Sequence, residues 1–305
     1  MSSQPTPEQP ISFEFVSSNG QTFEVATCGS GDRLALCLHG FPEHALSWRR
    51  QLPMLARLGY RAWAPNQRGY GRSSRPQGIQ EYSLEKLRDD VAGLIDASGA
   101  KETVLIGHDW GAVVAWNFAI RKVRPLDALI ILNVPHPKCY LDRLYRSSQF
   151  WKSWYIFLFQ LPWLPEWLLT RRNAQAISKM ILGSSTRREQ FPRDLLDTFR
   201  ENILSPGAAT AMLNWYRALF RGGGARRGVR EGFPVIQTRT LMIWGEEDVA
   251  LDKSTTYGTD RYVKDLTLRY LPGISHWVQQ DAPEAVNEMI ACFLSGNPVP
   301  EFPQK

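Results

Sequence analysis

Cysteine is scarce in this sequence, and its scarcity excludes two kinds of cross-linked protein. Four cysteines occur among 305 residues, at Cys28, Cys37, Cys139 and Cys292. They form no Cys-x-x-Cys pair and have no paired spacing, which argues against both a zinc site and a disulfide framework. We expect most of them to fill space in the core, and we expect no bound metal.

Long apolar runs are also missing from the sequence. No stretch of about 18 uninterrupted apolar residues occurs, so we expect no membrane-spanning helix. Residues 1–10 are polar and contain proline, without the apolar region of a secretory signal, which leads us to expect a cytoplasmic protein. A hydrophobic content of 43% is ordinary for a folded domain and excludes global disorder.

Positive charge is concentrated in one middle segment. Residues 137–221 hold 13 Lys and Arg against 6 Asp and Glu, whereas the remainder of the chain is almost neutral. These charges are dispersed among tryptophans and leucines and form no short basic blocks. We therefore expect a solvated basic face and no nucleic-acid partner.

Strand and helix patterns alternate over residues 33–135. An antiparallel hairpin is predicted first, from residues 11–16 and 21–27 around Asn19-Gly20. Buried strands are then predicted at residues 33–38, 60–65, 103–106 and 129–134, with helices between them, one of them from Trp48 to Leu58. This order predicts an α/β fold with a mostly parallel sheet and helices on both faces.

The alternation stops at residue 137 and resumes near residue 238. Between them, residues 137–221 show only helical patterns broken by prolines. We predict an inserted helical cap, or lid, at 137–221, between two halves of an α/β core at 1–136 and 222–305. Its aromatic-rich stretch is interrupted by charged residues and prolines, so we expect those aromatics to line a pocket, with a membrane surface as the alternative.

The central chemical signal is Gly107-His108-Asp109-Trp110-Gly111, which joins a buried strand to an apolar helix. Glycines on both sides allow a sharp elbow that would project the Asp109 side chain from the sheet. A carboxylate is already a nucleophile at neutral pH, and its attack on saturated carbon gives an ester that water can cleave. The alternative is that Asp109 simply caps the helix.

Two further polar residues follow predicted strands in the second half. Asp248 comes shortly after residues 238–244, and His276 comes shortly after residues 266–271. The chain order of nucleophile, acid and histidine is the order found in α/β-hydrolases.

At this point the chain resembles the soluble type of α/β-hydrolase epoxide hydrolase, over about residues 13–293. Three motifs carry the resemblance in the core: His39-Gly40-Phe41-Pro42-Glu43, the elbow, and Asn133-Val134-Pro135-His136-Pro137. Two more lie in the cap, Tyr155-Ile156-Phe157-Leu158-Phe159-Gln160 and Leu213-Asn214-Trp215-Tyr216-Arg217. The cap motifs are the specific ones, because dehalogenases share the elbow and the Gly-Phe-Pro loop.

The resemblance implies a fold and a set of roles. It implies the α/β-hydrolase fold with a helical cap, and a cis bond between Phe41 and Pro42. Asp109, Asp248 and His276 would form the catalytic triad, with Asp248 preferred to Glu246 and Glu247 because it is the third residue after Gly245. The implied roles beyond the triad are an acid pair, Tyr155 and Tyr216; an oxyanion hole, the amides of Phe41 and Trp110; and substrate contacts from His39, Pro42, Trp110 and Phe159.

We therefore expect a cofactor-free epoxide hydrolase whose partners are a small apolar epoxide and water, in a monomer or homodimer. Two alternatives are a haloalkane or haloacid dehalogenase on the same fold, and a receptor that binds an apolar ligand without turnover. One departure from the resemblance stands out: Asn66 occupies a position where these enzymes usually carry Asp, so a contact with Arg68 is expected to differ.

Overall fold

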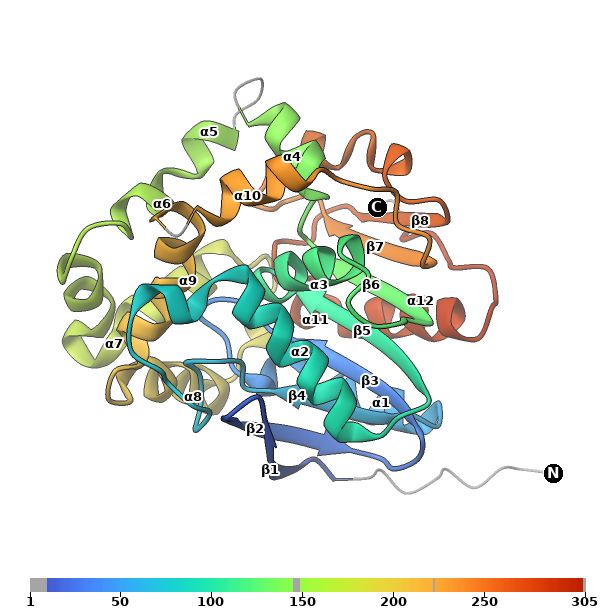
Figure 1. Cartoon of the computed structure of the whole chain (residues 1–305), viewed down its shortest axis with the longest axis horizontal. Helices are drawn as coiled ribbons and strands as arrows, with labels where there is room; N and C mark the ends of the chain where they lie inside the picture. Colours follow the sequence, from blue (N-terminus) through green and yellow to red (C-terminus); the bar gives the residue numbers. More distant parts are fainter. Residues whose placement is uncertain (1–9, 145–148, 222, 304–305) are drawn as a thin grey trace.

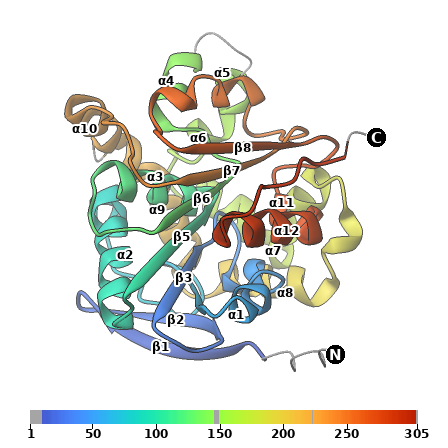
Figure 2. The same cartoon turned by 90° about the vertical axis from the view of Figure 1, so that its right-hand side faces the viewer.

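An eight-stranded sheet runs through the middle of the molecule (Figures 1 and 2). The structure is a computed structural model that describes residues 10–144, 149–221 and 223–303. The strands lie in the order β1-β2-β4-β3-β5-β6-β7-β8, and all neighbours are parallel except β1–β2 and β2–β4. Their bounds are β1 Ser12–Ser18, β2 Gln21–Cys28, β3 Arg33–Leu38, β4 Arg61–Pro65, β5 Glu102–His108, β6 Ala128–Leu132, β7 Thr240–Gly245 and β8 Leu266–Leu271.

Helices cover both faces of this sheet, as the alternating pattern predicted. Successive side chains of β3 point to opposite faces: Leu36 packs under α2 (Leu84–Ser98) and α3 (Trp110–Ile120), whereas Cys37 packs under α1 (Leu52–Arg57) and α12 (Pro283–Leu294). Figure 2 shows these two helical layers on either side of the strands. The central parallel strands β3, β5, β6 and β7 are mostly apolar on both faces because both faces are buried, whereas the edge strand β8 is only partly buried.

The sequence-based elements agree with the structure in type and differ at some ends. The hairpin turns at Asn19 and Gly20, which both have positive φ. The helix predicted from Trp48 is wrong at its start: a 3-10 turn spans Ala45–Trp48, and α1 begins only at Leu52. The cause is Pro53, whose fixed φ and missing N–H favour the first turn of a helix.

The described part of the segment between β6 and β7 consists of helices joined by loops, with one isolated bridge between Ile236 and Val263. Helix α7 is interrupted at residues 171–174, where the backbone is not helical. The helices are α4 Pro137–Arg143, α5 Gln149–Lys152, α6 Trp154–Leu158, α7 Leu164–Ser184, α8 Arg193–Leu204 and α9 Ala208–Arg221, followed by α10 Gly224–Glu231. Residues 145–148 of the predicted cap lie outside the described residues. Figure 1 shows α5 to α8 grouped at one side of the molecule, beyond the sheet.

The cap and the sheet share one apolar core. Phe199 of α8 and Trp215 of α9 belong to the same buried cluster as Trp116 of α3. Polar bonds join the two parts as well: Asn202 donates to the Glu43 carbonyl oxygen at 2.8 Å, and the Trp215 indole donates to the Arg68 carbonyl oxygen at 3.1 Å. These contacts fix α8 and α9 over the loops that follow β3 and β4.

The remaining general expectations concern cysteines, metals and membranes. All four cysteines are free, and three are buried, which confirms that most fill the core. Over residues 10–144, 149–221 and 223–303, no group of three or more His, Cys, Asp or Glu side chains could hold a metal ion. Within the same ranges, no helix has both the length and the apolar character needed to cross a membrane.

Candidate active site

The elbow between β5 and α3 holds Asp109 in a strained conformation. Its φ of 49° and ψ of −123° lie outside the ordinary regions for a non-glycine residue, as is typical of residues held in place at functional sites. Glycine is required on both sides of the turn: a Cβ at Gly107 would stand 2.6 Å from the Gly111 carbonyl oxygen, and one at Gly111 would stand 2.1 Å from the Leu38 carbonyl oxygen. The close approach predicted for the elbow is therefore present.

The Asp109 carboxylate is bound across the site. Its Oδ1 accepts a hydrogen bond of 2.7 Å from the Phe41 backbone N–H. The peptide bond between Phe41 and Pro42 is cis, as the resemblance implied. Although Asp109 occupies the N-cap position of α3, its side chain makes no capping hydrogen bond, so the helix-capping alternative is not favoured.

His276 lies between two carboxylates from different strand ends. Its Nδ1 is 2.7 Å from Asp248 Oδ2, and its Nε2 is 3.7 Å from Asp109 Oδ2. Asp248 and His276 are buried. The fold thus brings together the three residues proposed for the triad. Glu246, one of the two alternatives to Asp248, instead pairs with Lys253 at the surface.

The three groups change one another's pKa. Burial alone would raise the pKa of Asp109 and Asp248, but the neighbouring His276 outweighs it and holds both below their usual value. Burial alone would lower the pKa of His276, but the two carboxylates outweigh burial and raise it well above the usual value. The site therefore holds a cationic His276 between two anionic groups, Asp109 and Asp248.

Asn133 holds the acid in place, a role that sequence reasoning missed. It follows β6, has a φ of 45°, and donates from Nδ2 to Asp248 Oδ2 at 2.8 Å. The other Asp248 oxygen accepts from the Ala250 and Leu251 amides at 2.7 and 2.9 Å. The Asn133 motif was visible in the sequence, but nothing in the sequence alone linked it to Asp248.

A fully buried pair, Glu43 and His108, lies behind the triad. The Glu43 carboxylate is 2.9 Å from His108 Nδ1, and His108 Nε2 is 2.9 Å from the His276 carbonyl oxygen. Gln280 donates to the second oxygen of Glu43 at 2.8 Å. These bonds connect the loop after β3, the elbow and the loop after β8. Both residues stand inside motifs quoted above, so the signal was present without an assigned role.

Aromatic rings from the cap close over Asp109. Tyr216 of α9 is buried, with its ring centroid 4.9 Å from that of Trp110 and 5.6 Å from that of Phe41. Phe159 is 5.0 Å from Tyr216 and 5.7 Å from Tyr155 of α6. The Tyr155 and Tyr216 rings are 6.2 Å apart. The two cap motifs therefore meet above the elbow.

Both phenols remain protonated at neutral pH. Burial, and then the negative charge of Asp109, raise the pKa of Tyr155 and of Tyr216 well above the usual value. A neutral phenol beside a carboxylate can donate a hydrogen bond or a proton to an oxygen held between them.

The expectation that His39 contacts the substrate through a polar atom needs correction. His39 is fully buried, its Nε2 accepts from the Gln67 N–H, and its Nδ1 lies 2.9 Å from the Gly40 carbonyl oxygen, so it supports the loop and offers no free polar atom to a substrate.

The expected difference at Asn66 is present. Asn66 donates to Glu24 at 2.8 Å, whereas Arg68 pairs with Asp90 at 2.6 Å, so the two residues have separate partners.

The expectation that the cap aromatics line a pocket is wrong for most of them. Tyr155 and Phe159 face inward, but five others of the same stretch are exposed to solvent: Trp151, Trp154, Phe157, Trp163 and Trp167. The interruption by charges and prolines, which favoured a pocket, instead breaks the stretch into short helices with one face inside and one outside.

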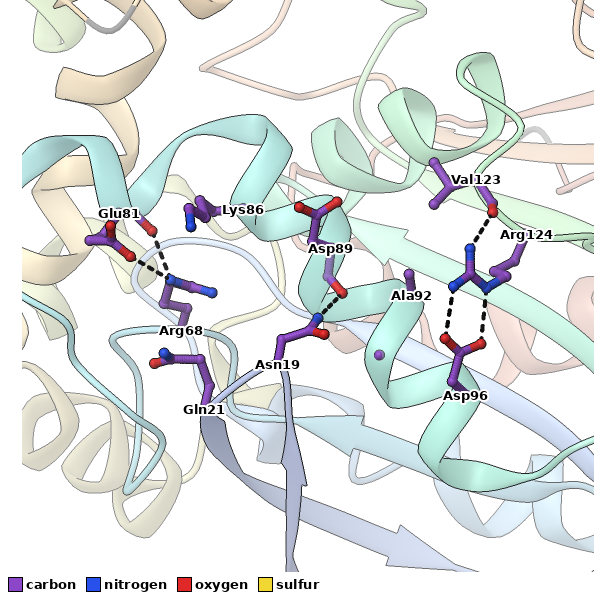
Figure 3. Close-up of a pocket in the computed structure, with 11 residues that line it drawn as sticks. Asn19, Gln21, Arg68, Glu81, Lys86, Asp89, Ala92, Asp96, Val123 and Arg124 are labelled. Atoms are coloured by element: carbon purple, nitrogen blue, oxygen red, sulfur yellow. Dashed lines mark hydrogen bonds and ion pairs between the residues drawn. The ribbon is translucent and has the colours of Figure 1, made fainter.

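A separate pocket of about 490 Å³ lies beside α2 (Figure 3). Three residues that line it are bonded to α2 or to the turn before α2. Arg68 donates to Glu81, Asn19 donates to the Asp89 carbonyl oxygen, and Arg124 donates to Asp96. Because its charges are balanced and none of the triad residues lines it, this pocket does not suit an apolar substrate.

Comparisons with known proteins concern the fold and the family. A family model described as the alpha/beta hydrolase fold matches residues 36–283. The AB hydrolase superfamily protein YfhM of Bacillus subtilis (strain 168) is 39% identical, with 93% of this chain and 98% of that protein covered. Epoxide hydrolase 3 of Xenopus tropicalis is 38% identical, with coverage of 87% and 73%. The crystal structure of Bacillus megaterium epoxide hydrolase with an inhibitor has a TM-score of 0.84 at 27% identity, with coverage of 92% and 100%.

Proposed function

This chain belongs to the epoxide hydrolases of the alpha/beta hydrolase fold, and from that premise we propose that it converts epoxides to vicinal diols through an ester on Asp109. One observation carries the proposal: the elbow presents a carboxylate bound to an amide at one oxygen and facing an imidazole at the other, with two phenols above it. We also propose that residues 137–221 act as the cap domain, since both phenols come from it.

The first step opens the epoxide ring. Asp109 Oδ1 is held by the Phe41 amide, so the free oxygen, Oδ2, is the one that attacks a ring carbon. The C–O bond of the ring breaks as the new C–O bond to Asp109 forms. Tyr155 and Tyr216 hydrogen-bond the epoxide oxygen, and one of them gives it a proton as negative charge develops there. Phe159 and Trp110 provide apolar walls for the substrate.

The second step cleaves the ester. His276, oriented by Asp248, takes a proton from water, and the resulting hydroxide attacks the carboxyl carbon of Asp109. Oδ1 becomes the oxyanion and is already bonded to the Phe41 N–H; the Trp110 N–H, at the start of α3, is the proposed second donor. Collapse breaks the bond between that carbon and Oδ2, the imidazolium of His276 gives its proton to Oδ2, and the diol leaves with Oδ2. The proton that His276 carried before this step restores the phenol, and the second proton of the water passes from the regenerated Asp109 carboxyl group to His276.

The charge of Asp109 determines when His276 can act as a base. While Asp109 is ionised, its charge and that of Asp248 keep the pKa of His276 raised, so the histidine is a cation and not a base. Once Asp109 is an ester, one of the two anions has gone, and the pKa of His276 falls. The imidazole therefore becomes a competent base only after the intermediate has formed.

A single turnover in heavy-oxygen water tests the proposal, with enzyme in excess over a small aryl epoxide. We expect a diol without label and heavy oxygen on the peptide that contains Asp109. Labelled diol and an unlabelled peptide would show that water attacks the epoxide directly. Halide release from a panel of haloalkanes, with no diol from any epoxide, would favour the dehalogenase alternative.

A further inference from the structure

Five aromatic side chains close together in the sequence of the cap are exposed to solvent. We call this set the outer cap face and define it by Trp151, Trp154, Phe157, Trp163 and Trp167. Trp151 is 77% exposed and Trp163 is 72% exposed, far more than pocket-lining side chains would be. Figure 1 shows α5, α6 and α7, which carry or adjoin these residues, along one outer margin of the molecule. So many exposed aromatic side chains in one short segment indicate a binding surface.

The orientation of this face is fixed by polar bonds inside the cap. The Arg217 guanidinium donates to the Phe159 and Leu161 carbonyl oxygens at 3.0 and 2.7 Å, and it pairs with Glu166 at 2.6 Å. Arg217 is buried, so these bonds hold the segment between α6 and α7 firmly. The segment keeps Phe159 inside and Trp163 outside.

Charge selects the partner. The cap segment, residues 137–221, has 13 basic and 6 acidic residues, and Glu166, the acidic residue beside Trp167, is already paired with Arg217. Arg171 lies with its guanidinium 4.6 Å from the Trp167 ring centroid, which adds a cation to the aromatic face. A second copy of this chain would bring the same positive charge to the contact and be repelled, whereas an anionic surface would be attracted.

We propose that the outer cap face docks on an anionic lipid surface. Tryptophan rings prefer the boundary between headgroups and acyl chains, and lysine and arginine beside them bind acidic headgroups. The contact is peripheral, because it needs only partial insertion of side chains and no membrane-spanning helix.

Docking would place the active site beside the lipid phase. Helix α6 bears Trp154 and Phe157 on its outer side and Tyr155 on its inner side, so one short helix separates the lipid from the phenols. From this geometry, and resting on the function proposed above, we infer that the substrates are long-chain epoxides that partition into membranes. The docking itself does not depend on catalysis.

Sedimentation of the whole protein with lipid vesicles tests the docking. We expect binding to vesicles containing about 30 mol% phosphatidylglycerol, weakened by salt, and about tenfold weaker binding to phosphatidylcholine alone. The double variant Trp151→Ser/Trp163→Ser should lose most of this binding, by about tenfold or more. A matched control, Phe13→Ser/Phe15→Ser, removes two exposed aromatics from β1 and should bind like the native protein.

Several results would overturn the proposal. One such result is equal binding of the native protein to both vesicle types, and a second is native-like binding by the tryptophan variant. A third is that the Phe13→Ser/Phe15→Ser control loses as much vesicle binding as the tryptophan variant. A native dimer that the tryptophan variant converts to monomer would assign the face to a second copy. The thermal midpoint of each variant verifies folding without any substrate, so a failed epoxide assay leaves this test intact. Where epoxides are hydrolysed, the tryptophan variant should slow on a long-chain epoxide in vesicles and keep its rate on a water-dissolved aryl epoxide.

Discussion

Replacing His276 with glutamine would separate the two proposed steps. The ring opening uses Asp109 and the two phenols and needs no general base, whereas ester cleavage needs His276 to deprotonate water. The variant should therefore open one equivalent of epoxide and stop at the ester. Glutamine keeps a polar group of similar length beside Asp248, so the variant disturbs the packing of this buried site as little as a substitution can.

The size of the effect follows from the geometry. Loss of a general base slows its step by roughly 10²- to 10⁴-fold, which makes ester cleavage slower than ring opening. His276 Nε2 is 3.7 Å from Asp109 Oδ2, so the variant also removes a cation that lowers the pKa of Asp109. That pKa rises in the variant, because the buried carboxylate keeps its desolvation without its partner. The reaction is best run at about pH 9, where the carboxylate stays ionised.

Intact mass measurement provides the readout. After mixing with one equivalent of a small aryl epoxide, the variant should gain the mass of the substrate, on a peptide containing Asp109. Asp109→Asn is the matched control and should gain nothing. The two-step mechanism is refuted if the histidine variant forms diol at the native rate, or forms diol with no adduct at any time.

Three further predictions address the acid, the phenols and two other buried histidines, His44 and His136. Asp248→Asn should slow ester cleavage by about 10²-fold or more with little effect on adduct formation, as pre-steady-state quench would show. Tyr155→Phe and Tyr216→Phe should each slow ring opening by roughly 10- to 10³-fold, and an unchanged single-turnover rate would remove that phenol from the mechanism. Burial lowers the pKa of His44 to about 3 and of His136 to about 4. Below about pH 6.5, these two histidines therefore bind protons in the unfolded chain but stay neutral in the folded chain. Stability should fall as pH drops from about 6.5, by about 2 kcal/mol per histidine at pH 5, and urea unfolding of His44→Asn should show a smaller loss.

Local patterns were sufficient for the fold and for the types of residue in the site. A strand buried on both faces is a nearly continuous apolar run, so β3 could be predicted to the residue. The bounds of β8 were also predicted correctly, although this edge strand is only partly buried and contains Thr267 and Arg269. The elbow could be predicted because glycines at fixed spacing are a steric requirement, here visible as the 2.1 Å approach of a Cβ at Gly111 to Leu38. The start of α1 could not be placed, since apolar spacing continued across the turn that precedes Pro53.

The tertiary structure decided which side chains meet and which face water. Asn133 and Asp248 are far apart in the chain, and only the parallel pairing of β6 with β7 brings them within 2.8 Å. The buried link from Glu43 through His108 to the His276 backbone likewise depends on three strand ends meeting at one edge. In the cap, aromatic composition alone could not divide inner from outer rings. Arg217 binds the chain between α6 and α7 at the Phe159 and Leu161 carbonyl oxygens, and around this point the folded chain buries Phe159 and leaves Trp163 in solvent.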